Sequence, residues 1–129
     1  MFKRKKNNSG SFLFKGDEPV HFASIIFTEQ TPSITAIEEE EFYLVKYKRK
    51  HIWALFKCPC GCGEVISLSL QKVHPKNWIV KKSRAGRPIL YPSVWQNIGC
   101  YSHFWINDGK VYWCSSTGTS PWPKEHDLD

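Results

Sequence analysis

The segment Cys58-Pro59-Cys60-Gly61-Cys62-Gly63 places three thiols within five residues, and it constrains the fold more than any other stretch. The chain has five cysteines, and the other two, Cys100 and Cys114, lie well downstream. Five cysteines cannot pair evenly, and thiols two residues apart are badly placed to bond to each other within one short loop. Alternating thiolates on a glycine-rich turn can converge on one soft cation, with Cys100 closing a tetrahedral site. We therefore expect a metal site rather than free structural thiols.

The expected ligands are the clustered cysteines and one distant partner: Cys58, Cys60, Cys62 and Cys100. Cys100-x-x-His103 is also a familiar two-ligand spacing, so three thiolates with one imidazole form the competing set, and Cys114 is a reserve ligand. A closed four-ligand site has no position for water, so we expect a structural Zn²⁺. Catalytic zinc needs such a vacancy and usually a carboxylate base, for which Glu64 is the nearest candidate.

The length and composition indicate one small aromatic domain. A chain of 129 residues has a modest core that a metal would help to stabilise, and six Trp, eight Phe and five Tyr predict an aromatic, sheet-like interior. The charged start does not resemble a signal peptide, and no apolar run approaches the roughly 20 residues that span a bilayer. We expect a cytoplasmic protein with no membrane partner, in a reducing compartment that suits thiolate ligands.

The net charge of +6 raises the question of nucleic-acid binding. The positive charge falls in three short clusters, at residues 3–6, 46–51 and 81–87. The second cluster closely follows the acidic run 38–41. Opposite charges so close in sequence are more typical of a solvated surface than of a phosphate track, so nucleic acid is not the expected partner.

The pattern along the chain predicts a mostly β, antiparallel fold in which a thiolate metal site joins two hairpins. We expect a flexible basic start at residues 1–10, a single β-rich zinc-binding domain at 11–114 and a flexible tail at 115–129. The segment 34–40 fits either a short helical turn or a charged loop, and 92–97 is expected to form a single helical turn. The strands are expected near residues 11–14, 20–27, 42–45, 52–56, 64–70, 78–80, 88–91, 103–106 and 110–114.

Two hairpins carry the cysteines. Apolar residues alternate with Ser67 and Ser69 after the cysteine cluster, which is the period-2 mark of a half-buried strand, so the cluster should lie at a hairpin tip. Asp108-Gly109 between two aromatic runs is a strong hairpin signal. That second hairpin would bring Cys100 and Cys114 near one end of the sheet. The tryptophans on or beside the expected strands are expected in the core: Trp53, Trp78, Trp95, Trp105 and Trp113.

Four motifs follow one another along the chain: Cys58-Pro-Cys-Gly-Cys-Gly-Glu64, Pro92-Ser-Val-Trp95, Gly99-Cys100-x-Ser102-His103-Phe104-Trp105 and Gly109-x-Val111-x-Trp113. Taken in order, these motifs resemble the BubE-like family of small bacterial proteins. The resemblance covers residues from about 52 to 114. Members of this family are associated with bacterial operons that encode ubiquitin-like proteins beside E1-like and E2-like enzymes. The resemblance implies a serine-type peptidase that processes or removes a ubiquitin-like modifier.

A serine mechanism needs a base within hydrogen-bond reach of the hydroxyl and donors for the developing oxyanion. We expect His103 as the general base and Ser102 as the nucleophile, with Ser93 as the substitute. Neighbouring side chains on a regular strand point to opposite faces, so Ser102 can reach His103 only if a turn forms there. The orienting acid is Asp108 or Glu64, and the amides of the cysteine turn are candidate oxyanion donors.

The leading hypothesis is thus a zinc-stabilised peptidase that acts on a bacterial ubiquitin-like protein, at its extended C-terminus or at its conjugates. The alternative is a non-catalytic zinc-binding adaptor that recognises the modifier or its E1-like and E2-like enzymes. A metallopeptidase that uses Glu64 ranks third, and a nucleic-acid-binding zinc module ranks fourth. A basic surface would suit an acidic partner.

Overall fold

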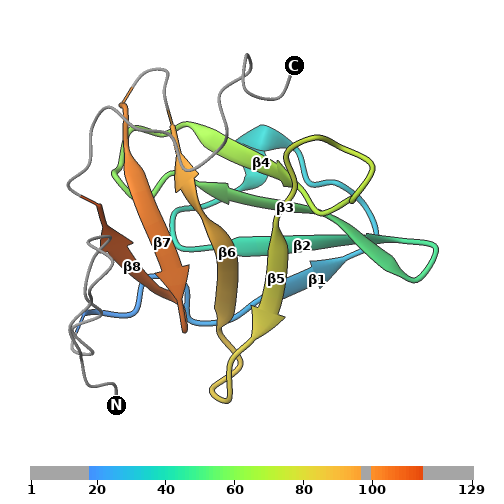
Figure 1. Cartoon of the computed structure of the whole chain (residues 1–129), viewed down its shortest axis with the longest axis horizontal. Coiled ribbons are helices and arrows are strands. Elements are labelled where there is room, and N and C mark those ends of the chain that lie inside the picture. Colours follow the sequence, from blue (N-terminus) through green and yellow to red (C-terminus); the bar gives the residue numbers. More distant parts are fainter. Residues whose placement is uncertain (1–17, 97–99, 115–129) are drawn as a thin grey trace.

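The computed structural model describes residues 18–96 and 100–114, which form two four-stranded β-sheets packed against each other (Figure 1). The first sheet has the order β1-β2-β3-β4 and the second β5-β6-β7-β8. Neighbouring strands are antiparallel except for the parallel pair β1 and β2, so the predicted fold class is confirmed. The elements are β1 (Ile26–Thr28), the 3₁₀ helix η1 (Ile34–Ala36), β2 (Phe42–Tyr47), β3 (Lys50–Lys57), β4 (Val65–Ser69), β5 (Ile79–Lys82), β6 (Pro88–Trp95), β7 (His103–Asn107) and β8 (Lys110–Trp113).

Phenylalanine and aliphatic side chains fill the layer between the sheets. The rings of Phe42 and Phe56 stack with centroids 5.1 Å apart, and Phe56 reaches Phe104 of the other sheet at 6.5 Å. The tryptophans predicted for the core lie at its margins: Trp53 and Trp78 are half-buried and pack against the core clusters, Trp95 and Trp105 are half-buried, and Trp113 is 50% exposed. An indole N–H needs a hydrogen-bond partner when buried, which favours the margins of an apolar layer over its centre.

The segment before β1 departs from its predicted form. A strand was expected over residues 20–27, but the first strand is β1, and Val20 only forms an isolated bridge to Lys110. Phe22 is fully buried against Phe42, and its backbone N–H donates to the Gly109 carbonyl at 2.9 Å. The chain here inserts a ring into the core instead of pairing along a sheet edge. The strand expected at 11–14 lies outside the described residues, as do the two terminal segments proposed above.

The helical turn predicted for residues 92–97 is also wrong. Residues 92–95 continue β6, where Val94 pairs with Phe104 and Trp95 with His103, while residue 97 lies outside the described residues. Burial of Val94 in the core and pairing across the strands outweigh the local turn preference. The Asp108-Gly109 turn is confirmed, with φ of 54° and 73° at its two central residues.

A short connection covers the outer side of the first sheet. Ile37, directly after η1, is buried against Val45 and Leu55, so the ambiguous segment 34–40 combines a single 3₁₀ turn with an acidic loop. Among the described residues, no helix has the length and apolar character needed to cross a membrane.

Candidate active site and metal centre

The cysteine turn lies at the tip of the hairpin between β3 and β4, as predicted. The Cys58 amide donates to the Glu64 carbonyl at 2.8 Å, and the Gly61 amide donates to the Cys58 carbonyl at 3.1 Å. Gly61 and Gly63 have φ of 92° and 89°, a backbone region that glycine enters at little cost. The two glycines therefore allow the chain to fold back with three thiols on one turn.

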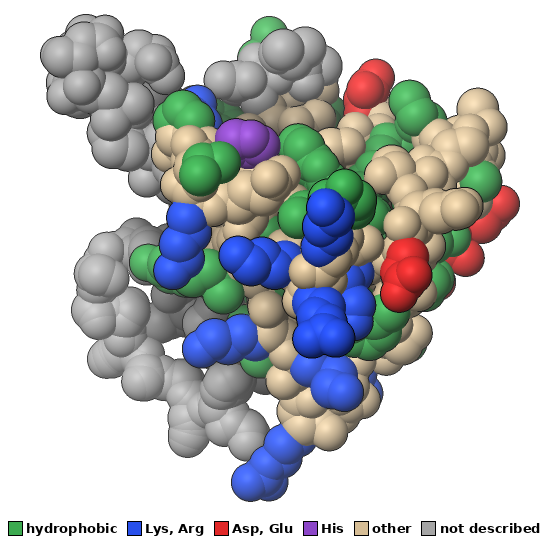
Figure 2. Space-filling model, turned by 90° about the vertical axis from the view of Figure 1, so that its right-hand side faces the viewer, with side chains coloured by type: hydrophobic (Ala, Val, Ile, Leu, Met, Phe, Trp, Pro, Cys, Tyr) green, Lys and Arg blue, Asp and Glu red, His purple; other side chains and the backbone are tan. Residues whose placement is uncertain are grey.

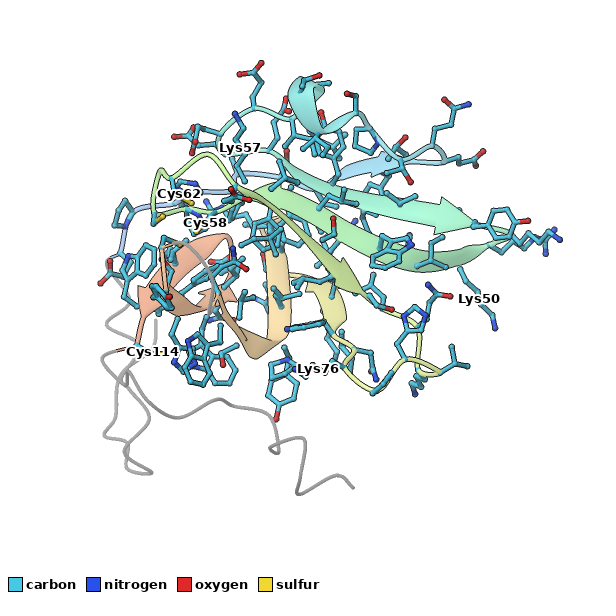
Figure 3. All side chains as sticks on the ribbon, turned by 90° about the horizontal axis from the view of Figure 1, so that it is seen from above. Lys50, Lys57, Cys58, Cys62, Lys76 and Cys114 are labelled. Atoms are coloured by element: carbon cyan, nitrogen blue, oxygen red, sulfur yellow. The ribbon has the colours of Figure 1, made fainter. Side chains whose placement is uncertain are left out.

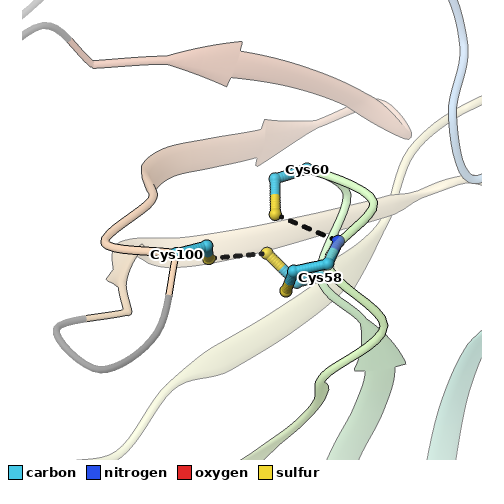
Figure 4. A group of neighbouring side chains, drawn as sticks. Cys58, Cys60 and Cys100 are labelled. Atoms are coloured by element: carbon cyan, nitrogen blue, oxygen red, sulfur yellow. Dashed lines mark hydrogen bonds between the residues drawn. The ribbon is translucent and has the colours of Figure 1, made fainter.

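Cys100 completes this cluster from the second sheet, in the connection between β6 and β7 (Figure 4). The four sulfur atoms lie within 4.8 Å of one another, and Cys58 Sγ is 3.6 Å from Cys100 Sγ. Four metal–sulfur bonds of about 2.3 Å in a tetrahedron place the sulfurs about 3.8 Å apart, so the arrangement fits a thiolate-bound metal ion. Neither His103 nor Cys114 belongs to this cluster. All five cysteines are free of disulfides.

The surroundings of the cluster affect its thiols unequally. Burial raises the pKa of the Cys58 thiol, which is fully enclosed. Burial also acts to raise the pKa of the Cys100 thiol. Hydrogen bonds from the side chain and backbone of Ser102, and from the thiols of Cys60 and Cys58, outweigh this effect and lower the pKa to about 7. The Ser102 hydroxyl donates to Cys100 Sγ at 3.1 Å, so this serine supports the thiol cluster.

The other predicted serine lies against the histidine. Ser93 Oγ is 3.0 Å from His103 Nε2, and the Ser93 side chain is 1% exposed. In the tautomer that carries its proton on Nδ1, the imidazole accepts a hydrogen bond from the Ser93 hydroxyl. The structure thus brings Ser93 and His103 together, while Ser102 is turned toward Cys100.

An irregularity in strand pairing produces this contact. Leu90 pairs with Ile106 and Val94 with Phe104, so three residues of β6 stand opposite one residue of β7, Trp105. Such bulges bend a strand and redirect its side chains. Ser93, two residues before Trp95, shares the face on which Trp95 pairs with His103.

Two tryptophans contact the Ser93–His103 pair. The Trp95 and His103 rings stack with centroids 5.6 Å apart and planes 21° apart. The Trp78 indole N–H donates to the Ser93 carbonyl at 3.3 Å. Both tryptophans were expected in the core, so the sequence interpretation missed their contacts with the candidate catalytic residues.

The structure also contains a second serine–histidine contact that the sequence interpretation missed. Ser69 Oγ forms a hydrogen bond with His74 Nδ1 and accepts one from the Gln71 amide at 3.1 Å. The His74 amide in turn donates to the Gln71 carbonyl at 3.0 Å. These partners lie between Ser69, the last residue of β4, and His74, so the contact stabilises the local turn and offers a matched control for the other pair.

Of the two predicted orienting acids, Asp108 is engaged elsewhere. Asp108 accepts a hydrogen bond from the Ser83 hydroxyl at 2.6 Å and pairs with Arg87 at 3.2 Å. It directly follows the end of β7 opposite to His103, about 16 Å away along the strand. This position does not support contact between the Asp108 carboxylate and His103. Glu64, the other predicted acid, is exposed beside the cysteine turn.

Comparison with known proteins identifies the family. The family of the bacterial ubiquitination-like system serine protease, BubE, matches residues 27–114, about two thirds of the chain. The match begins before the motifs recognised in the sequence and contains all five cysteines, Ser93 and His103. No curated protein and no solved structure matches the chain. The resemblance seen in the sequence is therefore confirmed, and the chain belongs to the BubE family of bacterial ubiquitination-like system serine proteases.

Proposed function

We propose that this protein is a zinc-stabilised serine peptidase that cleaves a bacterial ubiquitin-like protein, at a C-terminal extension or at its conjugates. Ser93 is the nucleophile and His103 the general base. The observation that carries the assignment is the 3.0 Å contact between Ser93 Oγ and His103 Nε2 in a family of serine proteases. Ser102, the first candidate in the sequence, instead has a supporting role at Cys100.

The chemistry follows from this contact. His103 Nε2 takes the hydroxyl proton as Ser93 Oγ attacks the scissile carbonyl carbon, and the imidazolium then gives that proton to the departing amine. Water hydrolyses the resulting ester, with His103 accepting a proton from the water and returning one to Ser93. Stacking on Trp95 restrains the imidazole plane during both transfers.

The metal in this proposal is Zn²⁺ held by Cys58, Cys60, Cys62 and Cys100, and it supplies structural cross-linking. Four thiolates make a closed site without a position for water, which argues against a metallopeptidase. Cys100 precedes His103 by three residues, and the Gln96 amide donates to the Ser102 carbonyl at 2.7 Å. The cross-link therefore anchors the connection from which β7 and its histidine emerge.

Intact-mass analysis tests the proposal on a ubiquitin-like protein of such a system that carries a C-terminal extension. We expect a discrete truncation by the unaltered protein and none by Ser93→Ala. Ser69→Ala removes the hydroxyl of the other serine–histidine contact, and Ser102→Ala tests the first sequence candidate; both should retain cleavage. Truncation by Ser93→Ala at the unaltered rate would refute the assignment.

One observation favours the second candidate, a non-catalytic adaptor. Ser93 is 1% exposed, so the side chains that cover it must move before a substrate can reach its hydroxyl. A buried serine that only bonds a neighbouring imidazole would show the same geometry. An adaptor binds the modifier, or its E1-like or E2-like enzyme, and leaves the extended modifier unchanged in mass, which separates the two functions in the same experiment.

A further inference from the structure

A basic face lies away from the metal centre, and we define it by Lys46, Lys48, Arg49, Lys50, Lys81 and Lys82. In Figure 1 β5 is the strand of the second sheet that is drawn nearest to the tip of the β2–β3 hairpin, and Figure 2 shows Lys and Arg side chains gathered on the side of the molecule where that tip lies. Lys46 is half-buried and the other five are exposed. None of the six forms an ion pair within the described part of the chain.

The fold separates charges that are neighbours in the sequence. The acidic run at residues 38–41 lies just before β2, and the basic residues begin near the end of β2 and continue through the hairpin tip. The six-residue strand therefore separates the two runs by about 20 Å. This exceeds the screening length of about 8 Å at physiological salt. The basic residues are exposed to solvent, as expected, and the acidic run that precedes them in the sequence lies too far away to neutralise them.

The hairpin tip also has hollows that suit protein side chains. One hollow of about 410 Å³ is lined by Phe27, Thr28, Glu29, Lys46 and His51. A neighbouring hollow of about 470 Å³ is lined by Glu29, Lys46, Tyr47, Lys48 and Arg49. The rings of Phe27 and Tyr47 are 55% and 59% exposed, and exposed aromatic rings with arginine are typical anchors of protein interfaces. Hollows of this size beside exposed aromatic rings favour a protein partner, whose side chains can fill them.

The turn itself uses residues that its backbone disfavours. Lys48 and Arg49 have φ of 50° and 71°, the left-handed region in which a two-residue hairpin prefers Asn-Gly. Strained residues of this kind cluster at functional positions. The Lys48 ammonium also lies 5.3 Å from the centre of the Tyr47 ring, which holds charge beside an exposed aromatic surface. The sequence therefore places two cations where a neutral turn would be more stable.

We propose that the basic face docks an acidic surface on the folded body of the protein substrate while an extended segment of that substrate enters the site at Ser93. This inference rests on the proposed function. The β5 part of the face adjoins the site, because β5 pairs with β6, the strand that carries Ser93, and the Trp78 indole just before β5 donates to the Ser93 carbonyl. Complementary charge raises association rates and fixes the orientation of a partner.

Charge reversal tests the docking with two substrates, the extended ubiquitin-like protein and a short peptide that spans its scissile bond. For Lys48→Glu/Arg49→Glu we expect kcat/KM to fall about tenfold or more on the protein at low salt and to change less than twofold on the peptide. Lys48→Asn/Arg49→Gly, which removes the charge and relaxes the turn, should give an intermediate loss on the protein. Equal rates of protein cleavage in all three proteins would overturn the docking.

Binding to Ser93→Ala proteins separates this inference from the proposed function. If the unaltered protein cleaves neither substrate, the proposed function fails, and the affinity of the extended ubiquitin-like protein decides the docking alone. Weaker binding upon charge reversal would support it, and equal or undetectable binding would overturn it. Tighter binding of a 20-nucleotide single-stranded DNA, with a steep salt dependence, would assign the face to nucleic acid instead.

Discussion

Replacing Cys100 by alanine tests whether the thiol cluster cross-links the two sheets. Cys100 is the one member of the cluster that comes from the connection between β6 and β7 in the second sheet (Figure 4), whereas the other three lie on the turn between β3 and β4. The substitution therefore removes the connection between the sheets at this end and leaves the turn intact. It also removes the acceptor of the Ser102 hydroxyl, close to His103.

The expected loss can be worked from the length of the closed loop. Cys58 and Cys100 are 42 residues apart, and cross-linking a loop of that length restricts the unfolded chain by about 4 kcal/mol at 25 °C. A small domain has a total free energy of unfolding of about 5–15 kcal/mol. Losing this cross-link would thus remove a large part of the stability, and we expect cleavage to fall with it as the start of β7 loosens.

The assay is urea denaturation of the unaltered protein and of Cys100→Ala, each with and without a metal chelator, with the bound metal counted by native mass spectrometry. Chelation should lower the free energy of unfolding of the unaltered protein by several kcal/mol, and by much less in Cys100→Ala, because the variant already lacks the cross-link. Cys114→Ala is the matched control. Its thiol lies outside the cluster, and it should keep one bound metal.

Two results would refute this reasoning. If chelation left the unfolding of the unaltered protein unchanged, the cluster would not hold a stabilising metal. If Cys100→Ala and Cys114→Ala lost the same stability and bound the same metal, Cys100 would not be the distant ligand. Equal chelator effects in the unaltered protein and Cys100→Ala would place the metal on the turn alone.

Three further substitutions have defined outcomes. Trp95→Ala should lower kcat about tenfold with little change in KM, because the His103 ring loses the indole on which it stacks. Trp95→Phe should restore most of the rate. Equal kcat in the unaltered protein and both variants would exclude a positioning role for Trp95. Gly109→Ala should lower the free energy of unfolding, measured by urea denaturation, by at least about 2 kcal/mol more than Gly86→Ala. Both glycines have positive φ, but only at Gly109 would a Cβ overlap the Phe22 carbonyl, so equal losses would contradict this. Lys48→Asn/Arg49→Gly should raise the free energy of unfolding by about 1 kcal/mol, since both residues have positive φ, and a loss of stability would argue against turn strain.

The hairpins could be predicted from the sequence because turn chemistry is local. Asp108-Gly109 supplies the two positive φ angles that a tight hairpin needs, and the structure has them. Glycines on the cysteine turn act in the same way, so the three neighbouring thiols could be placed together. The contribution of Cys100 was inferred from ligand number rather than from any local pattern, and the cluster geometry agrees with it.

The Ser93–His103 contact could not be predicted in this way. It depends on how β6 and β7 align, and that register shifts between Leu90 and Val94. Adjacent residues in the sequence suggested Ser102, but alternation along a strand turns neighbouring side chains apart. A serine two residues before a tryptophan gives no signal that both face a histidine on the next strand. Only the paired sheet defines that relation.

The tryptophans show a second limit of sequence patterns. An apolar residue on a predicted strand was assigned to the core, yet a strand has two faces and both can carry aromatic rings. Phenylalanine, which has no polar atom, fills the layer between the sheets here, and the indoles lie at its margins. The distinction depends on where each N–H finds a partner, as Trp78 does at the Ser93 carbonyl.

β3 runs between the basic face and the metal centre: it begins at Lys50, on the hairpin tip, and ends at Lys57, next to Cys58. Figure 3 shows Lys50 at the opposite end of the sheet from Cys58 and Cys62. The two features should therefore act on cleavage separately. Metal removal should lower cleavage of the peptide and of the protein substrate by the same factor, because it disturbs the start of β7. Charge reversal at Lys48 and Arg49 should lower cleavage of the protein alone. If chelation reduced protein cleavage much more than peptide cleavage, the metal would also be supporting the docking surface, and the independence argued from β3 would be wrong.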